Sequence, residues 1–243
     1  MKQCSAVIIG VGPEEGLGAT LAKYFSKKGL HVFIAGRHED KLELTAKEIR
    51  ESGYMVTTVV ADATVEYDVI RLFHIVQQSG HRVDIAVYNV DSNIPSPILE
   101  TSTDTFTTLW KQNCLGAFFF GKEVINAMKK EGAGTLFFTG ATASLRSKPP
   151  FTAFASAKFA LRALAQGMAR EFAPQGIHVV HTIIDGVIDG ERAKKQFPDY
   201  VRAKGKDGLL ALNAIAETYW AIHQQHPSAW THELDLRPFK EPF

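Results

Sequence analysis

Short segments with the apolar pattern of buried β-strands alternate along this chain with segments that carry apolar residues at helical spacing. The expected strands cover residues 6–9, 31–35, 55–60, 83–88, 134–139, 177–184 and 232–236, and the expected helices cover residues 17–28, 39–52, 65–78, 103–130, 151–172 and 208–223. Strands that alternate with helices form a parallel sheet covered on both faces, because right-handed crossovers return each strand to the same sheet. The pattern therefore predicts an α/β fold with a doubly wound parallel sheet of about seven strands.

The 243 residues show no linker, low-complexity tract or internal repeat, so we expect a single domain over residues 1–243. Residues 185–208 lack clear periodicity, which favours a mobile substrate lid there. The net charge of +1 gives no field that would attract nucleic acid or a membrane, and no apolar run is long enough to span one. Cys4 and Cys114 have neither metal nor disulfide spacing, and no signal peptide is visible, so we expect a cytoplasmic protein without a metal.

A glycine-rich turn connects the first expected strand to the first expected helix. Residues 10–18 read GVGPEEGLG, with Gly12, Gly16 and Gly18 in the turn and Leu17 at the start of the helix. Glycines let the backbone turn sharply and approach a pyrophosphate, whose charge is stabilised by the helix N-terminus. The turn therefore predicts a dinucleotide site, and a plain strand-helix turn is the alternative.

The spacing of these glycines resembles that of the short-chain dehydrogenase/reductase family, and further matches follow in the expected order over about residues 5 to 190. The matching residues outside the turn are Asp62, Ala63, Asn89, Asn113, Lys158, Gly186 and Ile188. The resemblance implies a Rossmann-type fold, a nicotinamide cofactor and hydride transfer between that cofactor and a small-molecule carbonyl or alcohol. It also implies that Asp62 caps the adenine ring, that Asn113 supports the catalytic lysine through a water, and that the chain forms a homodimer or homotetramer.

The catalytic motif of that family is altered in this chain. Residues four apart on a helix share a face, so Phe154 and Lys158 point to the same place. They match the family's Tyr-x-x-x-Lys motif, in which the tyrosine exchanges the proton and the lysine holds the nicotinamide ribose. Phe154 has no hydroxyl to donate, and Ala141 stands where the family has a serine that binds the carbonyl oxygen. Asn113 and Lys158 remain of the four catalytic positions.

Several other groups are candidates for the missing proton donor. The hydroxyls of Thr142 and Ser144 lie just beyond the lost serine, and Lys158 could itself give a proton. Asp185 replaces a proline that lies near the nicotinamide in the family, where a protonated carboxyl could donate. Thr142, Ser144 and Asp185 are alternatively loop residues without a chemical role. A catalytically impaired NADP(H)-binding protein with a regulatory or scaffold role is the second interpretation, because the fold alone does not decide.

The residues after the second expected strand favour NADP(H) over NAD(H). An NAD-selective site carries an acidic side chain here for the ribose 2′-hydroxyl, and residues 35–37 contain none. Arg37 could bind a 2′-phosphate with its planar guanidinium group, although it is alternatively a plain surface arginine. Glu14 and Glu15 favour the opposite choice, because their carboxylates would repel that phosphate.

Overall fold

Seven parallel strands form one sheet in the order β3-β2-β1-β4-β5-β6-β7. The structure is a computed structural model, and it describes residues 2–241. The strands are β1 (Cys4–Ile9), β2 (His31–Gly36), β3 (Val56–Val60), β4 (Arg82–Tyr88), β5 (Gly134–Ala141), β6 (Ile177–Ile184) and β7 (Glu233–Leu236). The predicted doubly wound parallel sheet is confirmed, and its strand order reverses between β1 and β4. Ligands of such sheets bind at this reversal, beyond the carboxyl ends of the strands.

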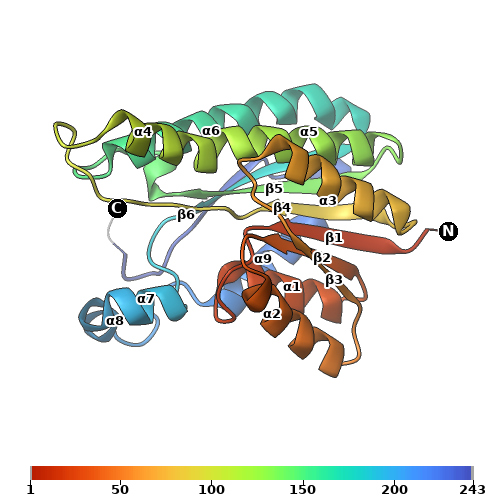
Figure 1. The fold of residues 1–243 in the computed structure, drawn as a ribbon, viewed down its shortest axis with the longest axis horizontal. Coiled ribbons are helices and arrows are strands. Elements are labelled where there is room, and N and C mark those ends of the chain that lie inside the picture. Colours follow the sequence, from red (N-terminus) through yellow and green to blue (C-terminus); the bar gives the residue numbers. More distant parts are fainter. Residues whose placement is uncertain (1, 242–243) are drawn as a thin grey trace.

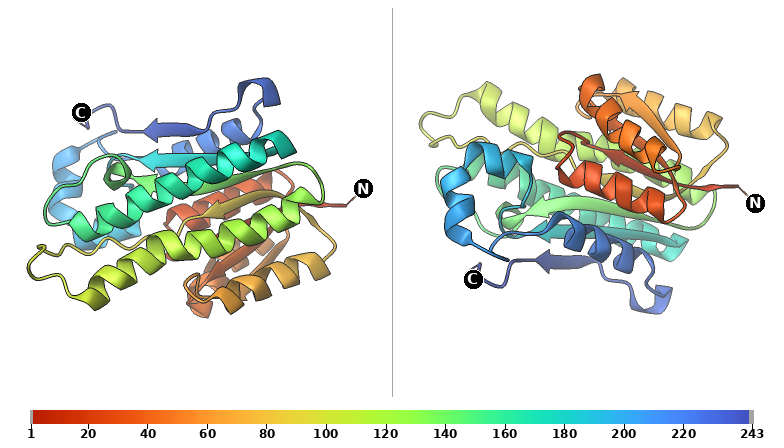
Figure 2. Two further views of the ribbon diagram at one scale, coloured as in Figure 1. Left: turned by 90° about the horizontal axis from the view of Figure 1, so that it is seen from above. Right: turned by 90° about the horizontal axis from the view of Figure 1, so that it is seen from below.

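Helices cover both faces of the sheet (Figure 1). They are α1 (Leu17–Lys27), α2 (Glu39–Glu51), α3 (Glu66–Gln78), α4 (Thr103–Trp110), α5 (Gly116–Lys129), α6 (Thr152–Phe172), α7 (Glu191–Gln196), α8 (Pro198–Lys204) and α9 (Leu212–His223). Short turns of other helical types are η1 (Lys111–Leu115), η2 (Thr142–Ser144), η3 (Ala173–Gln175) and η4 (Pro227–Ala229). Figure 2 shows α5 and α6 side by side over one face, and α1 and α9 over the other.

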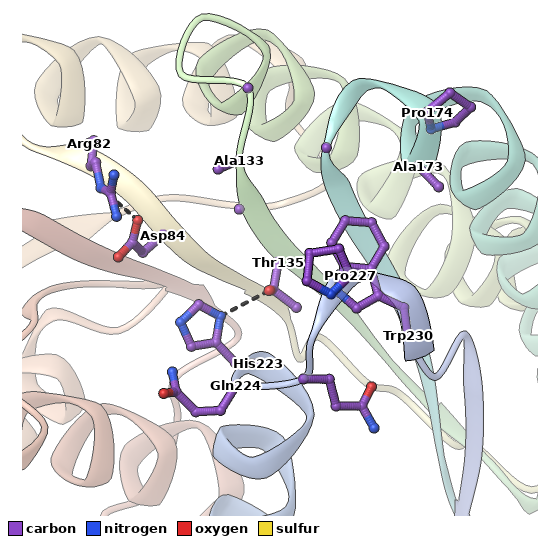
Figure 3. A pocket seen from close by; sticks show the side chains of 14 residues that line it. Arg82, Asp84, Ala133, Thr135, Ala173, Pro174, His223, Gln224, Pro227 and Trp230 are labelled. Carbon is purple, nitrogen blue, oxygen red and sulfur yellow. Dashed lines mark hydrogen bonds and ion pairs between the residues drawn. The ribbon is translucent and has the colours of Figure 1, made fainter.

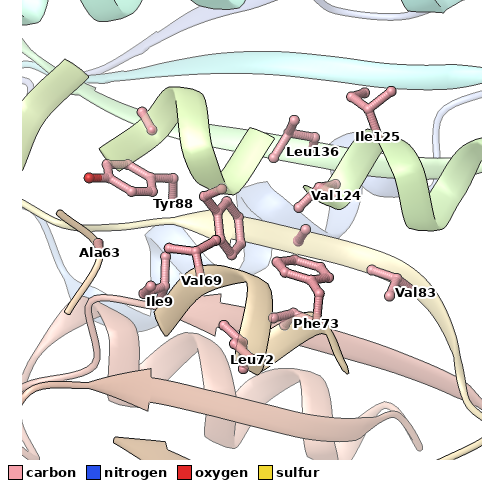
Figure 4. Packing of buried hydrophobic residues seen from close by; sticks show 14 of the residues in the cluster. Ile9, Ala63, Val69, Leu72, Phe73, Val83, Tyr88, Val124, Ile125 and Leu136 are labelled. Atoms are coloured by element: carbon pink, nitrogen blue, oxygen red, sulfur yellow. The ribbon is translucent and has the colours of Figure 1, made fainter. Parts of the chain in front are cut away.

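The core consists of two apolar layers, one on each face of the sheet. Val7 and Ile9 of β1 pack in the layer under α3, α5 and α6, whereas Ala6 and Ile8 pack in the layer under α1 and α9. Successive side chains of a strand point to opposite faces, so a strand buried on both faces must be apolar throughout. Figure 4 shows the first layer, in which Val69 and Phe73 of α3 meet Tyr88, Val124 and Leu136.

Two of the expected helices are wrong in detail. The helix expected over residues 103–130 is interrupted by η1, a π-helical turn that contains Asn113. Such turns insert one extra residue into a helix and are frequent at functional sites. The helix expected from residue 208 begins only at Leu212, because the backbone amide of Leu210 donates to the carbonyl of Val187 instead of starting a helical turn.

The segment expected to be a lid contains α7 and α8, which lie beside the main helical layers (Figure 1). It contacts the glycine-rich turn, since the amide of Glu191 donates to the carbonyl of Glu15 at 2.9 Å. Its mobility stays a prediction. Among residues 2–241, no helix combines the length and the apolarity that crossing a membrane requires.

Candidate active site

The glycine-rich turn packs tightly against its neighbours and leaves one side open. A Cβ on Gly18 would stand 2.9 Å from the carbonyl oxygen of Gly10, so only glycine fits there without a shift. Asn89, which follows β4, donates its side-chain amide to that same Gly10 carbonyl at 3.2 Å. Apart from Gly12 and its two chain neighbours, no described residue has an atom within 4 Å of the point where a Cβ on Gly12 would stand. The turn therefore has the shape that lets a dinucleotide backbone approach the main chain.

The first turn of α1 has the free donors that an anion needs. Gly16 is the N-cap of this 11-residue helix, and no side chain caps it. The first amides of a helix have no partners within the helix, and together with the helix dipole they attract phosphate. Gly16 and Leu17 therefore lie as the sequence predicts for a pyrophosphate-binding turn.

The residues predicted for the adenosine half follow the ends of β2 and β3. Asp62 accepts hydrogen bonds from the amide and the hydroxyl of Thr64, both at 2.8 Å, which fixes the turn that also contains the buried Ala63. Arg37 directly follows β2 and is exposed, and it takes part in none of the ion pairs found among residues 2–241. The strands β1, β2 and β3 are adjacent and parallel, so their carboxyl ends lie together. Asp62 and Arg37 therefore lie on the same side of the sheet as the glycine-rich turn.

Lys158 is buried at the carboxyl end of β5, with 1% of its side chain exposed. Its Nζ donates to the carbonyl of Thr139 at 3.1 Å and lies 3.1 Å from Oδ1 of Asp91. The same Nζ lies 5.7 Å from the centre of the Phe154 ring, as the spacing on α6 predicted. An ammonium has three hydrogens, so these two oxygens leave one for another acceptor.

An apolar wall stands at positions 141 and 154, which the resemblance matches to two catalytic hydroxyls. Phe154 is 6% exposed and packs with Ala143 and Ala155, and Ala141 and Phe151 pack against them. The structure thus brings Ala141, Phe154 and Lys158 into one region. No hydroxyl belongs to the side chains at positions 141 and 154 themselves.

Two other candidate donors, Thr142 and Asp185, are already engaged with each other. Thr142 donates its hydroxyl to Asp185 at 2.5 Å, and Asp185, 1% exposed, also accepts from Arg146 at 3.1 and 3.2 Å and from Arg237. A carboxyl group surrounded by these donors is an acceptor, so the geometry favours the loop-anchoring interpretation of Asp185 over an acid role. Gly186 and Ile188 follow Asp185 in the chain, and Ile188 forms an isolated parallel β-bridge with Leu210.

Ser144 and Asn113 are both fully buried. The hydroxyl oxygen of Ser144 accepts from the amide of Ala141 at 3.2 Å. The side-chain amide of Asn113 donates to the carbonyls of Ser92 at 3.1 Å and Leu109 at 2.9 Å, and its Oδ1 has no hydrogen-bond partner within residues 2–241. A buried oxygen of this kind is an acceptor for a water. This fits the water that the resemblance places between Asn113 and the lysine.

Sequence reasoning missed two charged residues at this site. Asp91 pairs with Lys158, and its Oδ2 lies 3.6 Å from Arg192 of α7, which also donates to Asn93. The position of Asp91 just after β4, two residues beyond Asn89, was the signal that could have revealed it. Arg192 carried no such signal, because its contact depends on how α7 packs.

A partly buried cluster of His181, Glu233 and Arg162 was missed as well. His181 of β6 is completely buried, and its Nδ1 lies 2.9 Å from Glu233 of β7. Glu233 also accepts from Arg162 of α6 at 2.7 and 2.6 Å. Burial lowers the pKa of His181 to about 4, whereas the hydrogen bond from Arg162 lowers the pKa of Glu233. At neutral pH the ring is therefore neutral and Glu233 is charged.

A cavity of about 720 Å³ lies at the amino ends of the strands, opposite to the predicted site (Figure 3). Its lining includes Arg82 and Asp84 near the start of β4, Thr135 near the start of β5, and Trp230. His223 shares a hydrogen bond of 2.9 Å with Thr135 in it. None of the predicted site residues lines this cavity. Ligands of parallel sheets bind beyond the carboxyl ends of the strands instead.

Comparison with known proteins identifies the protein family to which the chain belongs. The family model described as short chain dehydrogenase matches residues 6–200, so the chain belongs to the short-chain dehydrogenase family. The predicted family is thereby confirmed, and with it the class of oxidoreductase, whose members typically act on alcohol and carbonyl groups with NAD(P).

Individual relatives agree with this class. The crystal structure of a short-chain dehydrogenase from Rhodopseudomonas palustris is 36% identical, with a TM-score of 0.83, and covers 98% of this chain and 100% of that one. The uncharacterized oxidoreductase YxjF of Bacillus subtilis (strain 168) is 28% identical over 198 residues, 82% of this chain and 77% of the relative. The actinorhodin polyketide ketoreductase, solved with NADPH, shares the fold at a TM-score of 0.88 and 19% identity, covering 100% of this chain and 98% of that one.

Proposed function

We propose that the chain is an NADP(H)-dependent oxidoreductase that moves a hydride between the nicotinamide and a small-molecule carbonyl or alcohol, with a proton donor other than tyrosine. The observation that carries the proposal is the buried ammonium of Lys158, which is held at the carboxyl end of β5 by Thr139 and Asp91. A buried charge is costly unless it is paired, and the chain retains this one although the tyrosine is absent.

The charges around the glycine-rich turn support NADP(H). Glu15 pairs with Lys194 at 3.1 Å, so part of its negative charge is neutralised. A hydrogen bond to Glu48 raises the pKa of Glu14. Arg37 remains available to a 2′-phosphate. A gluconate 5-dehydrogenase from Burkholderia cenocepacia J2315, 21% identical, was solved with NADP and tartrate, and the ketoreductase was solved with NADPH.

The bound cofactor supplies or accepts the hydride. Gly12, Gly16 and Gly18 would hold its pyrophosphate, and Lys158 its nicotinamide ribose. The hydrogen of Lys158 that neither Thr139 nor Asp91 accepts would be shared between a ribose hydroxyl and the substrate oxygen in a three-centre bond, and it is the proton that we assign to the substrate. In reduction, a proton leaves Nζ as the carbonyl oxygen becomes a hydroxyl, and water returns a proton to the amine. Phe154 forms an apolar wall beside this hydrogen and keeps other water away.

NADPH consumption in the presence of varied aldehydes and ketones tests the proposal. We expect carbonyl-dependent oxidation of NADPH by the wild-type chain, and loss of this activity in Lys158→Met, which removes the ammonium but keeps a long side chain. Equal rates in the two proteins would contradict the role of Lys158. A wild-type chain that binds NADPH but oxidises it with none of the carbonyl compounds would contradict the enzymatic function.

The second candidate function is an impaired, NADP(H)-binding protein with a regulatory or scaffold role. The apolar side chains at positions 141 and 154 favour it, since both catalytic hydroxyls of the family are replaced. NADPH fluorescence that changes on binding, without turnover of any carbonyl compound, distinguishes this function from the first.

Assembly into a homodimer or homotetramer is also proposed. Phe118 of α5 and Phe159 of α6 are each 43% exposed, and they offer apolar surface to a second copy. Light scattering that finds only monomer at micromolar concentration would refute this assembly.

A further inference from the structure

Asp91 places a carboxylate beside the buried ammonium of Lys158. Oδ1 of Asp91 lies 3.1 Å from Nζ of Lys158, and its Oδ2 lies 3.6 Å from Arg192. The side chain of Asp91 is 36% exposed, whereas that of Lys158 is 1% exposed. Asp91 thus contacts the buried lysine and is itself partly exposed to solvent.

The proposed function, on which this inference rests, gives the carboxylate a second neighbour. Lys158 holds the nicotinamide ribose in that proposal, and the nicotinamide ring is attached to this sugar. The ring is positively charged in NADP⁺ and neutral in NADPH, and the rest of the cofactor is unchanged. A fixed negative charge near the ring therefore acts on one redox form and hardly on the other.

We infer that Asp91 determines the balance between the two redox forms of the cofactor and favours the oxidised one. The lysine and Arg192 repel a cationic ring, and Asp91 offsets this repulsion. A site that stabilises NADP⁺ relative to NADPH makes NADPH a better hydride donor, so the carboxylate favours the reduction of a carbonyl. Asp91 has this effect whether or not it also orients Lys158.

The size of the effect follows from Coulomb's law. A unit charge near the ring, in a medium between protein surface and water, would change a binding constant by about threefold to tenfold. The quantity that isolates this effect is the dissociation constant of NADPH divided by that of NADP⁺. Changes in packing or in phosphate binding alter both constants equally and leave the ratio unchanged.

Calorimetric titration of the full chain with each redox form tests the inference. Asp91→Asn keeps the size of the side chain and an oxygen for Lys158 but removes the charge, and we expect the ratio to fall by about threefold to tenfold. Asp91→Gly is a second neutral variant in case the first does not fold, and Asp91→Glu should restore the ratio. Asp189→Asn is the matched control, because this lid carboxylate lies 3.6 Å from Lys194 and has no contact with Lys158 in the described residues.

Each outcome of the titrations decides between defined alternatives. A ratio that falls in both neutral variants, and stays unchanged in Asp189→Asn, supports the inference. Equal losses of affinity for the two redox forms in the neutral variants would overturn it while leaving the proposed function intact. A wild-type chain that binds neither NADPH nor NADP⁺ would overturn the proposed function, and the inference with it.

Discussion

Acid should destabilise the fold through His181, the buried ring beside the proposed active site. Burial lowers the pKa of this histidine from 6.5 to about 4. The folded pKa is below the unfolded one, so the unfolded chain takes up the proton first as the pH falls. The stability that depends on the neutral ring is complete above pH 6.5 and is lost as the pH falls toward about 4. A pKa difference of this size corresponds to about 3 kcal/mol at most.

Urea unfolding of the wild type and of His181→Gln at a series of pH values measures this contribution. Glutamine cannot titrate but can still donate to Glu233, so the variant should lack the part of the acid sensitivity that is due to His181. Burial also lowers the pKa of His31, His178 and His223, and these residues act in both proteins alike. The difference in unfolding free energy between the two proteins should shift by about 3 kcal/mol or less across this pH range.

His74→Gln is the matched control for the urea experiment. His74 of α3 is exposed, so His74→Gln should give a curve parallel to that of the wild type. Parallel curves for His181→Gln and the wild type between pH 6.5 and 4 would refute the argument, because the buried ring would then titrate as it does in the unfolded chain.

Three further predictions concern the site itself. Phe154→Tyr combined with Ala141→Ser should raise carbonyl-dependent NADPH oxidation by about 10²-fold or more, since a general acid contributes that much; an unchanged rate across varied carbonyl compounds would contradict it. Arg37→Ser should weaken NADPH binding by about tenfold, as expected for the loss of a guanidinium-phosphate contact, and leave NADH binding unchanged in calorimetry. Asp185→Asn should lower the free energy of unfolding in urea by about 3 kcal/mol, because the buried ion pair with Arg237 is broken; no loss would show that the pair contributes nothing.

Periodicity and glycine spacing were enough to predict the sheet and the position of the glycine-rich turn. Both depend on local pattern, since an apolar strand buried on two faces has few alternatives. The π-helical turn at Asn113 could not be predicted, because apolar spacing alone does not reveal one extra residue in a helix. The start of α9 was misplaced for a related reason, as the backbone of Leu210 pairs with Val187, which is distant in sequence.

The charged partners at the site were the least predictable part. The pairing of Lys158 with Asp91 and that of His181 with Glu233 join different elements, so sequence distance gives no hint of either. The resemblance places Asp185 near the nicotinamide, but the sequence gives no sign that Arg146 and Arg237 donate to its carboxylate. The proposed roles of the individual site residues remain predictions.

Calorimetric titration of the wild-type chain with NADPH and with NADH tests the central claim most directly. The account predicts saturable binding of NADPH that is tighter than that of NADH. It also predicts that Gly18→Val binds neither NADPH nor NADH, because the added Cβ would stand 2.9 Å from the carbonyl oxygen of Gly10 and distort the turn. Absence of binding heat for both cofactors with a folded wild-type chain would contradict the account.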